Sequence, residues 1–312
     1  MADPTLKQLN ALIAIADSGL FRLAAEKLNV SQPALSEQIA QLEYRLGTRL
    51  LERDRRGARL TPVGEEVVDR ARRIQADVRA LESVVRSGAD NLGGLIRLGA
   101  LPTLGPYLMP HVVPVLRQRF PELRLYVREA AGDGLEKGVR SGQFDAILSV
   151  SPVRPEGLDR HRLFDEPLLL GVPRDDALAE AVPVEFGRLE GRDILALEHG
   201  HRMADQVRAL ASDARARLME DYQGTSLDGL RQMVGMGMGI TLFPALYVRS
   251  EIRNDPAVIA LPVNAPMASR EISLMWRSGS PRQDDYRELG TVIARQARKL
   301  LDEGPERQDL SV

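Results

Sequence analysis

A group of hydrogen-bonding side chains gathers near residue 31, where a turn gives way to a helix. Ser31 has the short hydroxyl side chain that commonly caps a helix, and a proline two positions later is typical of a first helical turn. A glutamine amide can bond an adenine edge through two hydrogen bonds, and a serine hydroxyl can address either base edges or phosphate. The candidate base-contacting residues are therefore Ser31, Gln32, Pro33, Ser36 and Gln38.

Guanidinium groups follow closely in the segment LLERDRRGARLT, residues 50–61, which reads as a small hairpin with Gly57 at its tip. Arg53, Arg55 and Arg56 would supply positive charge for phosphate contacts beside the helix. The alternative is that three short helices merely pack as a bundle and that these arginines are solvated surface residues.

Three short helices precede this basic hairpin. Apolar residues recur at helical spacing from Leu6 to Ala16 and from Phe21 to Leu28, and a third helix from Ser31 is expected to turn Ile39, Leu42 and Leu46 inward. Two helices joined by a turn of three or four residues form a helix-turn-helix. Residues 1–61 are therefore expected to form a winged helix-turn-helix DNA-binding domain.

Residues 62–87 read as a long linker helix. Its apolar residues are three or four positions apart, a coiled-coil-like seam that suits a dimer interface: Val67, Ala71, Ile74, Val78, Leu81 and Val85. The run SGADNLGG that follows is rich in glycine and predicts a hinge over residues 88–94.

Beyond the hinge, short β-rich runs alternate with helical stretches, which predicts an α/β fold with a mainly parallel sheet. The runs are 95–101, 123–128, 146–150, 168–172, 194–197, 240–243, 258–262 and 272–276. The segment beyond the hinge is longer than a single sheet with its helices usually needs. Residues 95–305 are therefore expected to form a two-lobed effector domain with a cleft between its lobes, and residues 306–312 a solvated tail.

Composition narrows the class of protein. Forty-two Lys and Arg against 44 Asp and Glu give a net charge of −2, so any nucleic-acid contact must come from local charge. No apolar run approaches the ~18 residues of a membrane span, and the first 20 residues lack a signal-peptide pattern. We therefore expect a cytoplasmic protein with no membrane partner.

The chain contains no cysteine, which removes disulfides, thiolate nucleophiles and cysteine-ligated zinc. The run EHGH at residues 198–201 lacks a third spaced metal ligand, and there is no Gly-x-Ser-x-Gly elbow or phosphate-binding loop. We expect neither an enzyme nor a cofactor. An enzyme that uses the α/β domain for catalysis is the remoter alternative.

The residues around the third helix also carry a family resemblance. The pattern FxxAAxxLxxSQPALSxQIxxLE at residues 21–43, followed by LG at 46–47 and LxR at 51–53, resembles the winged helix-turn-helix of LysR-type transcriptional regulators. That resemblance implies a two-lobed effector domain similar to periplasmic binding proteins. It also implies double-stranded operator DNA and RNA polymerase as partners, and a homodimer or homotetramer.

Within that family, the second domain resembles the OxyR-type peroxide sensors. The resemblance lies in LPTLGPYL at residues 101–108, LFDEP at 163–167, LEHGH at 197–201 and GITLxPAL at 239–246. Those sensors oxidise a cysteine directly after the histidine matched by His201 and resolve it with a second cysteine nine residues later. Arg202 and Ala211 stand at these positions here, so the thiol switch is impossible.

The same resemblance implies that Thr103, His201, Asp205 and Arg270 match pocket positions, whereas Gly132 stands where a threonine is expected and Ala204 where an arginine is. Two loops before helices offer hydroxyl and N–H groups, which with nearby arginines would suit a small anion such as a carboxylate. The alternative is that Thr and Ser are ordinary helix caps and the arginines surface residues. The candidate effector-binding residues are Thr103, Gly132, His201, Arg202, Asp205, Thr225, Ser226 and Arg270.

The sequence thus predicts a sequence-specific DNA-binding transcriptional regulator whose C-terminal domain senses a small molecule or another signal without cysteine redox chemistry. The alternative function within this class is an OxyR-like regulator that responds to peroxide by a route without thiols, which would need methionine oxidation or a bound metal in place of the cysteines.

Overall fold

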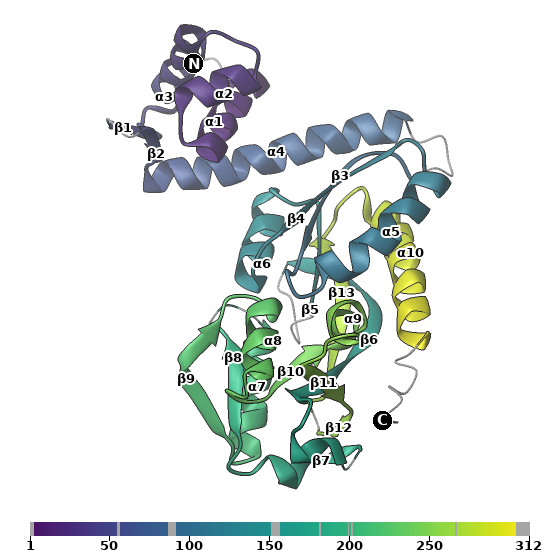
Figure 1. Ribbon diagram of the computed structural model, residues 1–312. Helices are drawn as coiled ribbons and strands as arrows, with labels where there is room; N and C mark the ends of the chain where they lie inside the picture. Colours follow the sequence, from purple (N-terminus) through teal and green to yellow (C-terminus); the bar gives the residue numbers. More distant parts are fainter. Residues whose placement is uncertain are drawn as a thin grey trace. The chain divides into compact units, whose positions relative to one another are not determined.

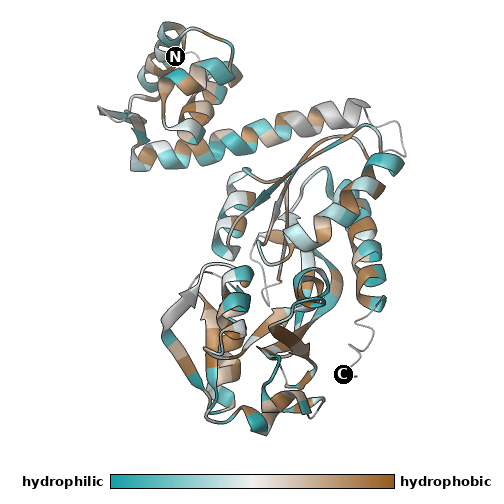
Figure 2. Cartoon of the chain, in the orientation of Figure 1, coloured by the Kyte–Doolittle hydropathy of each residue, from teal (hydrophilic) through white to brown (hydrophobic). Residues whose placement is uncertain are grey.

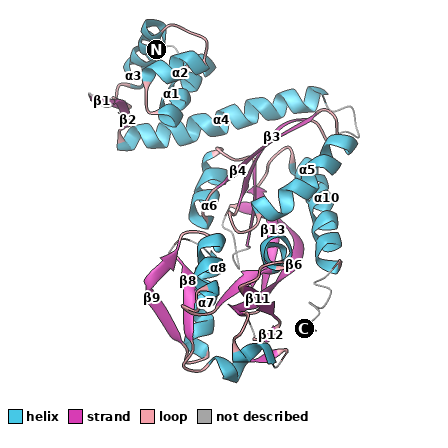
Figure 3. Cartoon of the chain, viewed as in Figure 1, coloured by secondary structure: helices cyan, strands magenta, loops and turns pink. Residues whose placement is uncertain are grey.

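A computed structural model describes residues 3–54, 57–86, 92–150, 157–180, 182–198, 200, 202–265 and 267–303. The chain divides into two compact units, the first chiefly residues 1–88 and the second chiefly residues 89–312. Each unit is considered by itself, with its elements labelled in Figure 1 and its helices and strands distinguished in Figure 3. In the part of the chain that the structure describes, no helix is both long enough and apolar enough to cross a membrane.

The first unit holds three short helices, a hairpin and a long helix. Its elements are α1 (Leu6–Ser18), α2 (Phe21–Lys27), α3 (Gln32–Leu46), β1 (Leu51–Asp54), β2 (Gly57–Leu60) and α4 (Pro62–Arg86). Gly19 and Gly47 end α1 and α3 in the left-handed conformation, each at φ +68°, which costs little for a residue without a Cβ. These glycines therefore fix the lengths of two of the three helices.

The core of this unit forms where α1, α2 and α3 meet. Ile39 and Leu42 are fully buried as expected, but Leu46 is 39% exposed and its predicted inward orientation is wrong. Leu35 is fully buried instead, because positions 35, 39 and 42 lie on one helical stripe, whereas position 46 lies in the last turn before Gly47.

The hairpin and the long helix are joined by a close backbone approach. A Cβ on Gly64 would lie 2.1 Å from the Leu50 carbonyl oxygen, so only glycine fits there. The Thr61 hydroxyl accepts a hydrogen bond from the Gly64 N–H at 3.0 Å. Along α4, Ala71 is buried in the core of the first unit, whereas Ile74 is 44% and Leu81 68% exposed in the single chain.

The second unit combines a mixed sheet with helices and two smaller strand pairs. Its elements are β3 (Gly94–Ala100), α5 (Gly105–Arg119), β4 (Leu123–Glu129), α6 (Gly132–Ser141), β5 (Ala146–Val150), β6 (Leu158–Pro173), η1 (Ala177–Glu180), β7 (Val184–Glu185), η2 (Phe186–Leu189), β8 (Asp193–Leu197), α7 (Arg202–Asp213), β9 (Arg217–Gly224), α8 (Leu227–Gly235), β10 (Thr241–Pro244), α9 (Ala245–Tyr247), η3 (Val248–Ile252), β11 (Val258–Leu261), β12 (Val263–Asn264), β13 (Ser269–Arg277) and α10 (Gln283–Asp302).

The prediction of a mainly parallel sheet is wrong. The large sheet has the order β10-β6-β13-β5-β3-β4, with β11 also paired to β6. Only β3 runs parallel to its neighbours, β4 and β5, while β13, β10 and β11 pair antiparallel with β5 or β6. The cause is β6, a single 16-residue strand of which the predicted run 168–172 is only the second half, and beside which β13 returns in the opposite direction.

Two lobes share this long strand. The core of the first lobe gathers residues of β3, α5, β5, β13, α10 and the first part of β6, and the core of the second gathers residues of the rest of β6 with β8, α7, α8, β10 and β11. Apolar residues mark the strands of both lobes in Figure 2. The predicted fold class, a helix-turn-helix followed by a long helix and an α/β domain, is thereby confirmed.

Candidate functional site

The leading end of α3 carries the candidate base-contacting residues. The Ser31 hydroxyl caps the helix by accepting a hydrogen bond from the Ala34 N–H at 3.3 Å. Ser31, Gln32 and Pro33 are exposed, and Ser36 is half-buried. The turn before them contains Asn29 at φ +53°, a conformation that asparagine tolerates better than most residues.

Helical geometry separates these residues into two groups. Gln32 and Ser36 lie one turn apart on the same flank of α3. Gln38 follows Ser36 by two positions, about 200° around the helix, so it lies on the other flank. A groove that receives Gln32 and Ser36 would therefore meet Gln38 only at its edge.

The hairpin carries part of the predicted basic surface. Arg53 lies in β1 opposite Ala58, with only its backbone described, and Arg55 and Arg56 lie outside the described residues. Its anchor is Glu43, a residue that we did not select from the sequence. One carboxylate oxygen of Glu43 accepts the N–H groups of Leu50 and Leu51 at 2.8 and 3.1 Å, which ties the end of α3 to the hairpin.

Two of the candidate effector residues, Thr103 and Arg270, meet in the second unit. The Arg270 guanidinium donates to the Thr103 hydroxyl at 2.8 Å and to the Thr103 carbonyl oxygen at 2.9 Å. It also donates from Nε and one terminal nitrogen to the same Glu166 oxygen, at 3.0 and 2.8 Å. The side chains of Arg270 and Glu166 are both 0% exposed, so the positive charge is neutralised inside the protein.

This buried pair lies where the two lobes join. Glu166 and Arg270 are directly opposite on β6 and β13, next to the point where β6 passes into the second lobe. The other Glu166 oxygen accepts the N–H of Leu246 in α9 at 3.0 Å. An anion could reach Arg270 only by displacing Glu166, so the arrangement fits a positioning role better than ligand capture.

A second pair, Gly132 and Arg202, connects the first turns of α6 and α7. A Cβ on Gly132 would lie 3.1 Å from Arg202 Cγ and 3.5 Å from its Nε, so the arginine side chain passes over the bare glycine backbone. Arg202 forms an ion pair with Glu136 of α6, and the two side chains are 32% and 23% exposed. One ion pair thus bridges the two lobes at the position where the resemblance places a reactive cysteine.

The remaining candidates are less closely grouped. Asp205 is exposed in the first turn of α7, and Thr225 is exposed before α8. The Ser226 hydroxyl accepts the Gly229 N–H at 3.1 Å and is an ordinary cap of α8. His201 lies outside the described residues.

The position of the expected second cysteine has a different environment from Arg202. Ala211 is 2% exposed on α7 and packs in the core of the second lobe, as Ala204 also does on the same helix. A thiol at position 211 would be shielded from solvent until α7 moved or partly unfolded.

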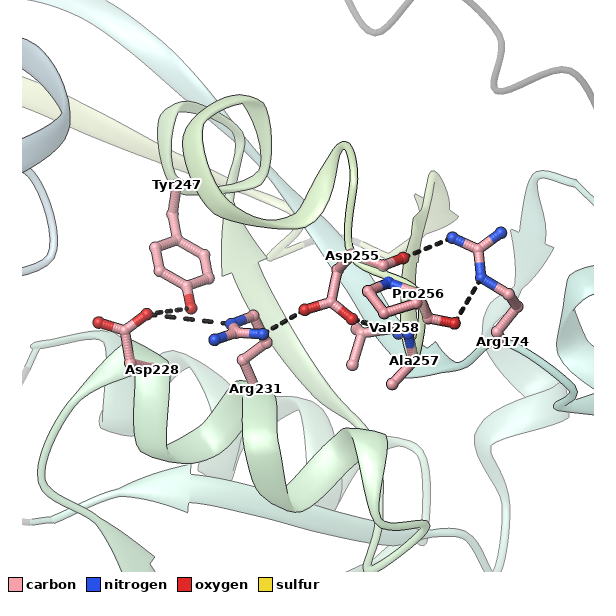
Figure 4. A network of polar contacts seen from close by, with 8 residues as sticks. All are labelled: Arg174, Asp228, Arg231, Tyr247, Asp255, Pro256, Ala257 and Val258. Carbon is pink, nitrogen blue, oxygen red and sulfur yellow. Dashed lines mark hydrogen bonds and ion pairs between the residues drawn. The ribbon is translucent and has the colours of Figure 1, made fainter.

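A polar network that the sequence did not reveal holds α8 and α9 (Figure 4). The Tyr247 hydroxyl donates to Asp228 at 3.0 Å, and Arg231 pairs with Asp255. The Tyr247 ring also meets the Tyr107 ring of the first lobe edge-on, with centroids 5.1 Å apart. The network therefore braces the second lobe where it touches the first.

Burial and hydrogen bonds oppose each other at Asp255. Burial alone would raise its pKa, but the N–H groups of Ala257 and Val258 donate to one carboxylate oxygen at 2.8 and 3.0 Å, and Arg231 pairs with the other. The pKa of Asp255 is lowered as a result. Within the described residues, no group of three or more His, Asp or Glu side chains is arranged to hold a metal ion.

Comparison with known proteins agrees with this two-part organisation. The family described as bacterial regulatory helix-turn-helix protein, lysR family, matches residues 6–65, and the LysR substrate binding domain matches residues 89–298. The DNA-binding transcriptional dual regulator OxyR of Escherichia coli strain K12 is 38% identical over 288 residues, 92% of this chain and 94% of that protein. A probable hydrogen peroxide-inducible genes activator of Mycobacterium avium is 34% identical over 291 residues, 93% of each chain.

Solved structures give the same result. A full-length OxyR from Pseudomonas aeruginosa with a cysteine replaced by aspartate is similar with a TM-score of 0.78 and 30% identity, over 94% of this chain and 95% of that one. A cysteine-to-serine variant of Corynebacterium glutamicum OxyR with hydrogen peroxide bound has a TM-score of 0.67 and 28% identity, over 96% and 95% of the two chains.

Proposed function

Because the chain belongs to the LysR family of DNA-binding transcriptional regulators, we propose that it regulates transcription in response to a small molecule, by an OxyR-like architecture that works without thiols. The family consists of transcription factors rather than enzymes. The observation that carries the proposal is at position 202. An arginine bound to Glu136 stands where a redox switch of this kind needs a cysteine.

Charge and burial favour Arg202 over Arg270 as the residue that meets an anionic effector. Arg270 is fully buried and paired, and separating such a pair costs about 3–5 kcal/mol. The Arg202–Glu136 pair is partly exposed, so the cost of separating it lies below that of a fully buried pair and approaches that of surface pairs, which contribute about 0–1 kcal/mol. A carboxylate ligand therefore competes with Glu136 for Arg202 at a lower cost than with Glu166 for Arg270.

Exchange of Glu136 for a ligand gives a mechanism for the response. The ion pair links α6 of the first lobe with α7 of the second, so a ligand that takes Arg202 from Glu136 releases one lobe from the other. A ligand shifts an equilibrium only by its differential affinity for the two states, and this link exists only in the unliganded one. The lobe rearrangement then changes how the subunits hold DNA.

The DNA-binding part of the proposal rests on α3 and the hairpin. Gln32 and Ser36 address base edges in the major groove, and Arg53, Arg55 and Arg56 contact the backbone or the minor groove. Two-fold pairing of such units through the seam of residues 62–87 predicts a partly palindromic operator, bound by a dimer or tetramer in the cytoplasm together with RNA polymerase. The division into residues 1–61, 62–87, 88–94, 95–305 and 306–312 belongs to this proposal.

The test is a thermal-shift screen of the full chain against small carboxylates, followed by footprinting with the best binder. A specific ligand raises the melting temperature of the wild type, and the rise should be smaller for R202Q. The matched control is R277Q, which removes an arginine outside the candidate effector set. Equal shifts in R202Q and wild type would overturn the role of Arg202, and a footprint without dyad symmetry would count against the paired operator.

One observation favours a second candidate, a peroxide response without thiols. Met236, at the end of α8, is 68% exposed, and an exposed thioether is open to oxidation. Relatives of this chain are named as hydrogen peroxide-inducible activators, which is why a peroxide response is considered. If Met236 is the sensor, peroxide should change the DNA footprint of the wild type but not that of M236L. A footprint of M236L that still changes with peroxide would rule out this candidate.

A further inference from the structure

A separate pocket lies in the first lobe between β6 and α10. Its volume is about 680 Å³, within the range of small-molecule sites, and it shares no residue with the candidate effector set. His161 and Arg162 of β6 form one wall. Successive turns of α10 form the other, among them Arg295, Arg298 and Lys299.

The charges on the walls do not cancel. Arg162 is paired with Asp165 and, at 3.2 Å, with Glu271, and the lining residue Glu303 is paired with Arg249 at 2.7 Å. Asp302 is the remaining acidic residue of the lining. Three cationic residues of the same helix outnumber it, so the pocket has an excess of positive charge.

These three cations are available to a ligand. Arg295 and Lys299 are exposed, and neither side chain has a hydrogen-bond or ion-pair partner among the described residues. Arg298 donates to the Leu163 carbonyl oxygen at 3.2 Å, a bond that leaves its charge uncompensated by any described carboxylate. Residues 295 and 299 are one helical turn apart on α10, so their charges project to the same side.

His161 adds a neutral donor to this wall. Its Nδ1 atom is buried without a partner, against the backbone of Gly290, where a Cβ would lie only 2.8 Å away. A proton on Nδ1 would have no acceptor, which favours the tautomer with the proton on Nε2. Burial and the nearby Arg287 lower the pKa of His161, which favours the neutral form of the ring.

We propose that this pocket binds a phosphorylated small molecule, with its phosphate oxygens against Arg295, Arg298 and Lys299. A phosphate group offers several acceptor oxygens to converging cations, whereas one carboxylate offers two. The volume leaves room for an organic portion beyond the phosphate. The occupied site joins β6, the strand that both lobes share, to the C-terminal helix.

The experiment is a calorimetric titration of the full chain with inorganic pyrophosphate at constant ionic strength. R295Q/K299Q removes two charges from the pocket, and R124Q/R128Q removes two exposed charges at the same spacing from β4. We expect saturable binding with a dissociation constant below about 1 mM for the wild type and the β4 variant, and at least about tenfold weaker binding for R295Q/K299Q. Tryptophan fluorescence of Trp276 verifies that each variant is folded.

Three outcomes of the pyrophosphate titration would overturn the proposal. They are equal affinity of R295Q/K299Q and wild type, an equal loss in R124Q/R128Q, and the absence of saturable binding. Tighter binding of citrate than of pyrophosphate would also overturn the phosphate class. The result is independent of the proposed effector site, because neither variant alters a residue of that site.

Discussion

Replacement of Glu166 by alanine tests how the two lobes are joined. The change removes the oxygen that accepts two bonds from Arg270 and the oxygen that accepts the Leu246 N–H. It leaves a guanidinium with no exposed surface and no counter-charge. Loss of one partner of a buried ion pair costs about 3–5 kcal/mol. Because whole domains are stable by only about 5–15 kcal/mol, E166A should lose a large part of the stability of the second unit.

Urea unfolding followed by tryptophan fluorescence measures this loss selectively. Trp276 is the single tryptophan of the chain and is 1% exposed in β13, the strand that carries Arg270. Its signal therefore reports on the second unit and not on the helix-turn-helix. The matched control is E271A, one residue from Arg270, because Glu271 forms partly exposed ion pairs with Arg160 and Arg162 and should cost about 1 kcal/mol or less.

A double-mutant cycle completes the test. E166A and R270A each leave an unpaired group, whereas the double variant leaves no unpaired charge, so its cost should fall well below the sum of the two. A loss below about 1 kcal/mol for E166A, or strict additivity of the cycle, would refute the argument that this pair is held by mutual neutralisation.

Three further predictions concern other sites. Gly132→Thr introduces a side chain 3.1 Å from Arg202 Cγ, so its thermal destabilisation should be smaller when combined with R202A; equal losses in both backgrounds would exclude this steric coupling. Gln32→Ala should weaken operator binding by about 1–3 kcal/mol in gel-shift titrations and leave binding to unrelated DNA unchanged; a uniform loss would assign Gln32 to the backbone. At Asp255, burial alone would raise the pKa, but backbone hydrogen bonds and Arg231 lower it, so its contribution to stability is complete above the unfolded pKa of about 3.9 and is lost as pH falls through the folded value. Urea unfolding of D255N should accordingly show less acid destabilisation than the wild type, and parallel curves would contradict the assignment.

The helix-turn-helix was predictable because its signals are local. Ser31 and Gly47 mark the two ends of α3 through effects within a few residues. The error at Leu46 arose because the stripe was extended into the last turn, where the chain leaves the core. Leu35 lies four residues before Ile39 on the same stripe, so the same helical spacing predicts its burial.

The contacts of the effector domain were not predictable, because they join distant segments. Glu166 lies 104 residues from Arg270, and Glu136 lies 66 residues from Arg202. Neither spacing carries a periodic signal. A hint was present at Glu166, which interrupts an apolar strand run between Phe164 and Leu168 and therefore needed a partner if buried.

The prediction of a mainly parallel sheet was wrong for a related reason. Alternating strands and helices favour parallel pairing when the chain crosses over within one sheet. Here the chain leaves the first lobe along β6, builds the second lobe, and returns as β13 antiparallel to its own exit. No local residue pattern marks that return.

The shared strands also set an order of events during synthesis. The first lobe begins with β3 but needs β13 and α10, whose residues emerge last from the ribosome. The helix-turn-helix and the second lobe have all of their strands and helices at an earlier point. At about 5–20 residues per second, roughly 6–24 seconds pass between the synthesis of β5 and that of β13, and during this time β5 and the first part of β6 lack β13 as their partner. Nascent chains stalled before β13 should therefore leave that lobe open to proteases while the helix-turn-helix is already protected.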